Sequence, residues 1–301
     1  MKTDTVQTIE NPVSTSSEGQ YTFSTGWLNS LLKHAALLLL AFVMLYPVLW
    51  MIASSFRPEN EIFGTISVIP TNITFDNYKS GWNFFGDMKF STFFINSFTI
   101  ATLAVVGNLV TTSMAGYAFA RLSFKWKSLW FGLMLGSIML PFHVQLIPQY
   151  IMFLKFGWVD TFVPLVLPKF LAVDSFFVFL MVQFMRTLPM ELEEAAQMDG
   201  ASYFRRYSQI ILPLSVPVLA TTAVFTFIFA YNDYLTALLY LTNIDKMTVQ
   251  QGLRLFLDSG GGTSAFGGLF AMSVLSLVPV FLLYLVSQRL LVRGIATTGF
   301  K

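Results

Sequence analysis

Long stretches without charged side chains alternate with short polar segments along most of this chain. Five such stretches contain no Asp, Glu, Lys or Arg, and they cover residues 34–56, 90–120, 128–154, 207–232 and 259–288. A helix that crosses a bilayer needs about 20 apolar residues, so each stretch is long enough. A sixth apolar segment, residues 170–187, contains Asp174 and Arg186 near its ends. The pattern therefore predicts an all-α, polytopic membrane protein with six transmembrane helices.

Prolines and glycines refine this arrangement. The third predicted span, residues 128–152, contains Pro141 and Pro148, and proline in a lipid-embedded helix usually kinks it. Residues 162–169 hold two further prolines and predict an outer-leaflet or re-entrant segment before the fourth span. The glycine run 260–262 predicts a flexible outer loop, because no lysine follows it as a phosphate-binding loop would require.

The first 29 residues differ from the rest in composition. They are polar, rich in Ser, Thr, Glu and Gln, and they lack the apolar core of a secretory signal. We therefore expect a disordered N-terminus over 1–29 and a transmembrane domain over 30–301. Six spans place both termini on one side, which would hold eleven of the 18 Lys and Arg residues, against seven on the other. The positive-inside rule then predicts that both termini are cytoplasmic.

Composition excludes several classes of protein. Only 11% of the residues are charged, whereas soluble domains have about 25%. No cysteine is present, which excludes disulfides, thiolate nucleophiles and cysteine metal sites. The sequence contains neither a Gly-x-x-x-x-Gly-Lys-Ser/Thr phosphate loop nor a His-Glu-x-x-His zinc motif. We therefore expect a chain that catalyses no covalent reaction and holds no ATP or metal, and nothing indicates a nucleic-acid partner.

The segment between the fourth and fifth spans, residues 186–213, is charged although it lies between apolar stretches; we call it the polar loop. Residues 190–198 predict a helix with acidic residues in its first turn, where they favour the helix dipole. Gly200 suits a left-handed position after that helix, and a second short helix is expected over 203–211. The polar loop should therefore be a helix-turn-helix on the membrane surface, with Glu194 and Asp199 offering charge to a partner.

The spacing within the polar loop resembles the signature loop of ABC importer permease subunits. The residues that carry the resemblance are Glu194, Ala195, Ala196, Gly200, Ile210, Leu212 and Pro213, with Asp199 and Ala201 matching an extended form. Elsewhere, Asn96-Ser97, Ala115–Ala118, Ile147-Pro148 and Asn232-Asp233 are similar to the six-helix, maltose-type subunit of the carbohydrate-uptake branch. The similarity covers residues 30–301. The tail 298–301 departs from the family pattern, as does Tyr231, where relatives commonly have Trp.

This resemblance implies a function and a set of partners. The residues quoted for the polar loop would dock in a cleft on an ATP-hydrolysing subunit, which alone would bind ATP and magnesium. Two such subunits, a second permease and an external solute-binding protein would complete the importer. The assembly would lie in the inner membrane of a bacterium and move a carbohydrate into the cytoplasm by ATP-driven alternating access.

Several polar residues in or near the predicted spans are candidates to line the transport pathway, and each has an alternative role. Gln145, Gln149 and Gln183 could hydrogen-bond a sugar or hold helices together. Asn232 and Asp233 could line the pathway, or could end the fifth helix at the outer interface. Lys169 and Asp174 could form a buried pair or contact substrate. They could also lie separately at the interface, because a spacing of five is poor for one face of a helix.

Other functions remain open. A permease of the same family could carry glycerol-phosphate-type substrates or acidic oligo- or polysaccharides. An ion-coupled secondary transporter would usually need more intramembrane charges or an internal repeat.

Overall fold

The computed structural model describes residues 26–64, 66–258 and 265–296. Within these, the regular secondary structure is helical, apart from an isolated antiparallel bridge between Phe85 and Met88. The chain divides into two compact units, residues 1–47 and 48–301. Helix α1 (Gly26–Ser55) begins about one turn before the boundary predicted at residue 30. The N-terminus up to residue 25, the glycine run 260–262 and the tail 298–301 lie outside the described residues.

Apolar helices long enough to cross a bilayer account for most of the chain. Four segments meet this criterion alone: Asn29–Ser55, α3 (Ser91–Arg121), Val163–Thr187 and Phe266–Gln288. Two bent pairs meet it together: α4 (Lys127–Ile138) with α5 (Phe142–Lys155), and Tyr203–Leu214 with α11 (Val216–Tyr231). If each bent pair is one span, six spans result, as the sequence predicts.

The third predicted span is broken rather than merely kinked. Helices α4 and α5 meet at 101° across Met139–Pro141. Pro141 precedes α5 with an extended backbone (ψ 131°), and the residue before a proline is itself disfavoured in helix. Pro148, in contrast, lies inside α5 without ending it. The proline kink predicted in the span over 128–152 therefore lies at Pro141, where it is a sharp break between two helices.

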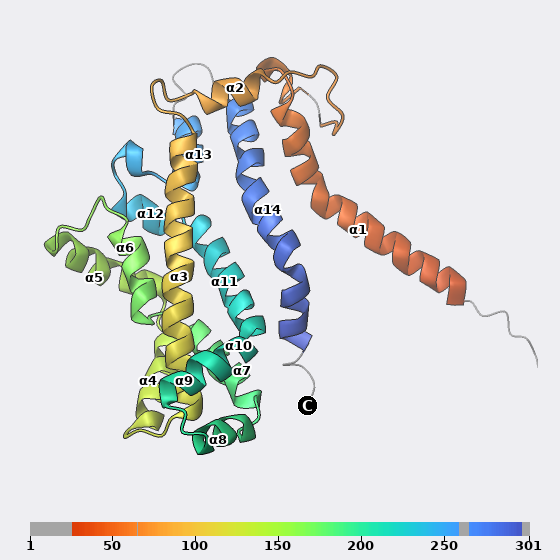
Figure 1. Ribbon diagram of the computed structural model, residues 1–301. Helices are drawn as coiled ribbons and strands as arrows, with labels where there is room; N and C mark the ends of the chain where they lie inside the picture. Colours follow the sequence, from red (N-terminus) through yellow and green to blue (C-terminus); the bar gives the residue numbers. More distant parts are fainter. Residues whose placement is uncertain (1–25, 65, 259–264, 297–301) are drawn as a thin grey trace, which may run out of the picture. The chain divides into compact units, whose positions relative to one another are not determined.

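Shorter elements connect the spans (Figure 1). On the way to α3 lie η1 (Glu59–Glu61) and α2 (Asp76–Trp82). The fourth span consists of α6 (Val163–Val166), η2 (Leu167–Leu171) and α7 (Ser175–Thr187). The remainder comprises α8 (Glu191–Met198), α9 (Tyr203–Arg206), η3 (Tyr207–Ile211), α10 (Leu212–Leu214), α12 (Leu235–Tyr240), η4 (Ile244–Lys246), α13 (Val249–Asp258) and α14 (Phe266–Ala296).

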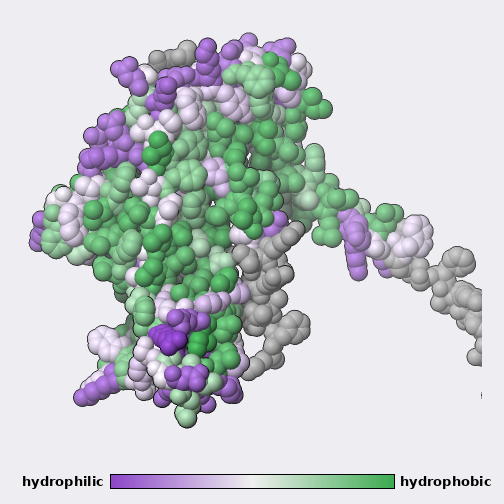
Figure 2. Space-filling model, viewed as in Figure 1, coloured by the Kyte–Doolittle hydropathy of each residue, from purple (hydrophilic) through white to green (hydrophobic). Residues whose placement is uncertain are grey.

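Helix α3 is the centre of the second unit and packs against both α7 and α11 (Figure 1). Buried Phe90 and Phe93 near its start join one apolar cluster, and Tyr117 near its end joins another with Met181 and Ile211. Figure 2 shows hydrophobic side chains over the middle of the second unit and hydrophilic ones gathered near α2 and near α8. This distribution suits a bilayer that surrounds the middle of the unit and leaves both polar ends in water.

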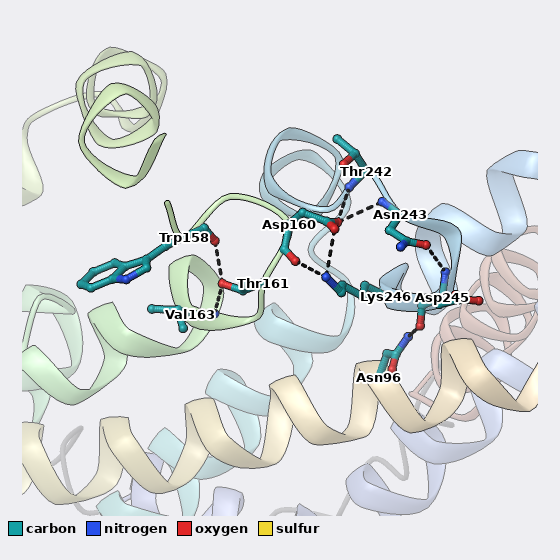
Figure 3. Close-up of polar contacts among 9 residues, drawn as sticks. All are labelled: Asn96, Trp158, Asp160, Thr161, Val163, Thr242, Asn243, Asp245 and Lys246. Carbon is teal, nitrogen blue, oxygen red and sulfur yellow. Dashed lines mark hydrogen bonds and ion pairs between the residues drawn. The ribbon is translucent and has the colours of Figure 1, made fainter. Parts of the chain in front are cut away.

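A polar clamp fixes the turn after α5 to the segment after α12 (Figure 3). The Asp160 carboxylate accepts hydrogen bonds from the backbone N–H groups of Thr242 (3.2 Å) and Asn243 (3.0 Å). The ammonium of Lys246 donates to the same carboxylate over 2.9 Å and to the Asp160 carbonyl over 2.6 Å. Asn96, on α3, donates to the carbonyls of Asp245 and Met247 and so ties the clamp to the central helix.

Candidate functional site

The polar loop has the predicted helix-turn-helix form. Helix α8 carries three acidic residues in its first turn and ends at a left-handed Gly200 with φ of +77°. The N–H of Ala201 donates to the carbonyl of Ala196 (2.9 Å), and that of Gly200 donates to Gln197 (3.0 Å). These two bonds form a Schellman motif, which satisfies the last carbonyls of a helix and needs a left-handed residue. The prediction for Gly200 is therefore confirmed.

A second short helix returns the chain to the membrane. The Ser202 hydroxyl accepts a hydrogen bond from the N–H of Arg205 and caps α9. The chain then forms one π-helical stretch, η3, before α10. The axis bends by 76° between Leu214 and Val216, where α11 begins. The bend turns the polar loop away from the direction of the fifth span.

Glu193 anchors α8 to the end of α3. Its two carboxylate oxygens have different partners: Oε1 lies 3.0 Å from Arg121 Nε, and Oε2 accepts a hydrogen bond from the Tyr117 hydroxyl over 3.0 Å. The side chains of Arg121 and Glu193 are 3% and 6% exposed. A buried charge pair with separate partners for each oxygen fixes orientation as well as distance.

Arg121 also holds the end of α7. Its Nη2 donates to the carbonyls of Met185 and Leu188, both over 2.6 Å, and its Nη1 contacts the sulfur of Met190. Since the last carbonyls of a helix have no partner within it, a cation at this position stabilises α7. The ends of α3 and α7 and the start of α8 therefore meet at one guanidinium.

Further contacts hold the second half of the polar loop. The hydroxyl of Tyr207 lies 2.8 Å from that of Ser113, again on α3. Arg206 donates to the Gln197 side chain over 2.9 Å, and its guanidinium lies 4.4 Å from the centre of the Tyr203 ring. Both halves of the polar loop are thus tied to α3 and to each other.

The opposite face of the polar loop is exposed. Glu194, Ala195, Asp199 and Gly200 face solvent, and Met198 is 88% exposed. A shallow pocket of about 230 Å³ opens between the two helices, lined by Ala196, Asp199, Ala201, Arg205, Gln209 and Ile210. Leu212 is half-buried and Pro213 exposed, beyond the pocket. The structure therefore brings Ala196, Asp199, Ala201 and Ile210 together, while Glu194 and Ala195 lie on the outer surface of α8.

A larger cavity lies among α3, α6, α11 and α12; we call it the charged cavity. Its volume is about 790 Å³, and its polar lining consists of Lys169, Asp174, Asn232, Asp233, Thr236 and Thr248. Lys169 Nζ lies 2.8 Å from Asp174 Oδ2, so of the alternatives for these residues the structure shows the pair. A spacing of five is poor for pairing on a continuous helix, but Ala172 is left-handed (φ 53°) and brings the two residues together.

The remaining candidate pathway residues lie in different surroundings. Asp233 lines the charged cavity and also accepts a hydrogen bond from the N–H of Thr236 (3.0 Å) at the start of α12. Gln145 lines an adjoining pocket of about 560 Å³ that shares Lys169 and Asp174. Gln149 is half-buried and Gln183 is exposed, and neither lines these two cavities.

Comparison with known proteins gives a consistent result. Residues 107–296, which include the polar loop, match the family "Binding-protein-dependent transport system inner membrane component". The chain is 30% identical over 270 residues to the diacetylchitobiose uptake system permease protein NgcG of Streptomyces coelicolor, covering 90% of this chain and 88% of NgcG. It is 32% identical over 267 residues to the trehalose/maltose transport system permease protein MalG of Thermococcus litoralis, covering 88% and 94% respectively.

A solved structure shares the fold. One chain in the crystal structure of a bacterial ABC transporter involved in the import of the acidic polysaccharide alginate aligns with a TM-score of 0.79 at 21% identity. The alignment covers 91% of this chain and 99% of that one, so the two chains share a fold. The expected likeness to ABC importer permeases is confirmed: this chain belongs to the family of binding-protein-dependent transport system inner membrane components.

Proposed function

We propose that this chain is the transmembrane permease subunit of an importer that moves a carbohydrate into the cytoplasm. The polar loop carries the proposal: its outer face is exposed, while its inner face is tied to α3 by Glu193 and Tyr207. A surface element that is rigidly connected to the membrane helices is suited to receive force from a partner. The family and the sugar-uptake names of the relatives NgcG and MalG support the same function.

The proposed partner is an ATP-hydrolysing subunit that docks on the exposed face of the polar loop. Glu194 and Asp199 would pair with basic groups of that subunit, and the pocket beside Ala196 would receive one of its side chains. ATP and magnesium would be held by that subunit. The polar loop and both termini would then be cytoplasmic, with the Asp160 clamp on the outer side, where a solute-binding protein delivers the substrate.

Alternating access follows from this arrangement. Closure of two ATPase subunits would move two permease chains together, exposing the charged cavity outward to receive substrate. ATP hydrolysis would reopen it to the cytoplasm. A second permease would complete the pathway, as the likeness to two-permease importers implies.

The charge of the cavity favours a neutral carbohydrate over an anionic one. Two carboxylates, Asp174 and Asp233, face one ammonium, that of Lys169, which is already paired. The remaining negative charge would repel the phosphate of a glycerol phosphodiester or the carboxylates of an acidic polysaccharide. Neutral hydroxyl groups can instead exchange hydrogen bonds with Asn232, Thr236 and Thr248.

Transport by the complete complex in proteoliposomes tests this function. Glu194→Lys reverses a docking charge, and Gly200→Pro removes both the left-handed turn and an N–H of the Schellman motif. Both variants should insert normally but lose coupled ATP hydrolysis and uptake. Lys79→Glu, an equally exposed charge reversal on α2, is the control and should transport normally. Normal uptake by both loop variants, or uptake driven by an ion gradient without ATP, would overturn the proposal.

A further inference from the structure

Two short connections join α8 to its neighbours along the chain. The turn Leu188–Met190 contains Pro189, and Gly200 follows the helix in a left-handed turn. The buried contacts of Glu193 are different, because they bridge 76 residues of sequence to Tyr117 and reach the last residue of α3, Arg121. Glu193 therefore connects α8 directly to α3, in addition to the two connections along the chain.

The polar contacts of Glu193 fix the orientation of α8 relative to α3. An apolar pair would hold the two helices together without desolvating charges, so stability alone does not require an ion pair here. Glu193, in contrast, accepts a hydrogen bond from Tyr117 with one oxygen and forms an ion pair with Arg121 through the other, and these partners lie on successive turns of α3. Rotation of α8 about its axis would lengthen at least one of these two contacts.

Helix α3 leads from this contact to the charged cavity. Arg121 is its last residue, and Ile100, 21 residues earlier on the same helix, lines the cavity. At 1.5 Å per residue the two positions are about 30 Å apart along one uninterrupted helix. Helix α7, whose end is held by the same guanidinium, lies against α3 near Gly116.

We propose that Glu193, Tyr117 and Arg121 form a positioning joint that transmits movement of α8 into α3 and thereby to the charged cavity. These residues touch neither substrate nor nucleotide; they act by fixing the orientation of α8. The inference rests on the proposed function, because it requires that a partner moves α8. It goes further in assigning the transmission of force to three buried residues that differ from those on the docking face.

Glu193→Gln tests the joint with little change of shape, since it removes the charge and one acceptor. Three quantities are measured on the complete complex in proteoliposomes: ATPase subunit retained per permease, ATP hydrolysed, and substrate transported per ATP. Retention should be unchanged, while substrate transported per ATP falls by about fivefold or more. Glu191→Gln, an exposed acid on the same helix, is the control and should leave all three unchanged.

A double variant shows whether the loss of transport comes from the joint or from a general loss of stability. Because Arg121 and Glu193 act as one unit, Arg121→Gln combined with Glu193→Gln should transport no less per ATP than Arg121→Gln alone. If Glu193→Gln does not accumulate in the membrane, Tyr117→Phe supplies the test, since it keeps the ring against Tyr207 and removes only the hydroxyl.

The outcomes distinguish the two proposals. Unchanged transport per ATP in Glu193→Gln with normal retention would overturn the joint and leave the proposed function intact. Loss of retention together with transport would also overturn it, because Glu193 would then only support the docking face. Failure of the unaltered chain to retain an ATPase subunit would instead contradict the proposed function itself.

Discussion

Gly116 on α3 lies directly against Met181 on α7: a β-carbon added to Gly116 would be 2.5 Å from the Met181 β-carbon. Helices approach closely in membranes at small residues, because van der Waals packing provides much of their association. We predict that Gly116→Val forces α3 and α7 apart and lowers the free energy of unfolding by about 1–3 kcal/mol. Thermal unfolding in detergent would measure the effect.

Gly132 provides the matched control for this substitution. It lies inside α4, and a β-carbon added there meets nothing within 4 Å. Gly132→Val should leave stability unchanged or raise it slightly, since valine also favours helix over glycine. Equal melting temperatures for Gly116→Val and the unaltered protein would show that the contact with Met181 is not tight.

Gly200→Ala should disturb the polar loop without unfolding the protein. The backbone at Gly200 is left-handed (φ +77°), a conformation that costs about 1–2 kcal/mol for a residue with a β-carbon. We expect a severalfold loss of ATP-driven uptake and a smaller loss for Gly200→Asn, because asparagine tolerates this conformation better. Equal activities of the two variants would contradict a conformational role for Gly200.

Asp174→Asn should change substrate uptake while changing the stability of the fold little. The side chains of Lys169 and Asp174 are 27% and 25% exposed, so their pairing contributes less than about 1 kcal/mol to folding. The variant would nevertheless change the charge of the cavity, and we expect KM for uptake to rise by about tenfold. Asp87→Asn, at an exposed position before α3, is the control. An unaltered KM would indicate that the charged cavity does not meet substrate.

The Asp160 clamp predicts a dependence of stability on pH. Hydrogen bonds from the Asn243 N–H and the Lys246 ammonium hold the pKa of Asp160 below its ordinary value of 3.8. The ionised carboxylate therefore stabilises the fold fully above pH 3.8, and this contribution is lost as pH falls through the lowered pKa. Asp160→Asn lacks the contribution, so its difference in unfolding free energy from the unaltered protein should shrink in acid. A difference that stays constant down to about pH 3 would exclude this role for Asp160.

The local form of the polar loop could be predicted because its determinants lie close together in sequence. Acidic residues at the start of α8, Gly200 at its end and Pro213 before the fifth span act through backbone conformation and the helix dipole. These effects need no knowledge of distant residues. The span lengths were predictable for the same reason, since hydropathy is a local property.

The anchor of the polar loop could not be predicted, because it depends on how α8 is rotated. Glu191, Glu193 and Glu194 are equivalent in the sequence pattern, yet only Glu193 is buried. One signal was available: Arg121 ends a predicted span on the same membrane side as the polar loop and needs an acidic partner. The ion pair of Lys169 and Asp174 was one of several alternatives and could not be chosen from the sequence, because nothing in it marks Ala172 as left-handed.

Site-specific photocrosslinking from position 196 tests the central claim most directly. The chain contains no cysteine, so Ala196→Cys introduces a single attachment point for a photoreactive probe beside the polar-loop pocket. In the reconstituted importer, the probe should crosslink to the ATP-hydrolysing subunit, and the same probe at Lys79→Cys on α2 should not. If position 196 instead crosslinks only to lipid or to the external solute-binding protein, the polar loop is not the site where the motor subunit docks.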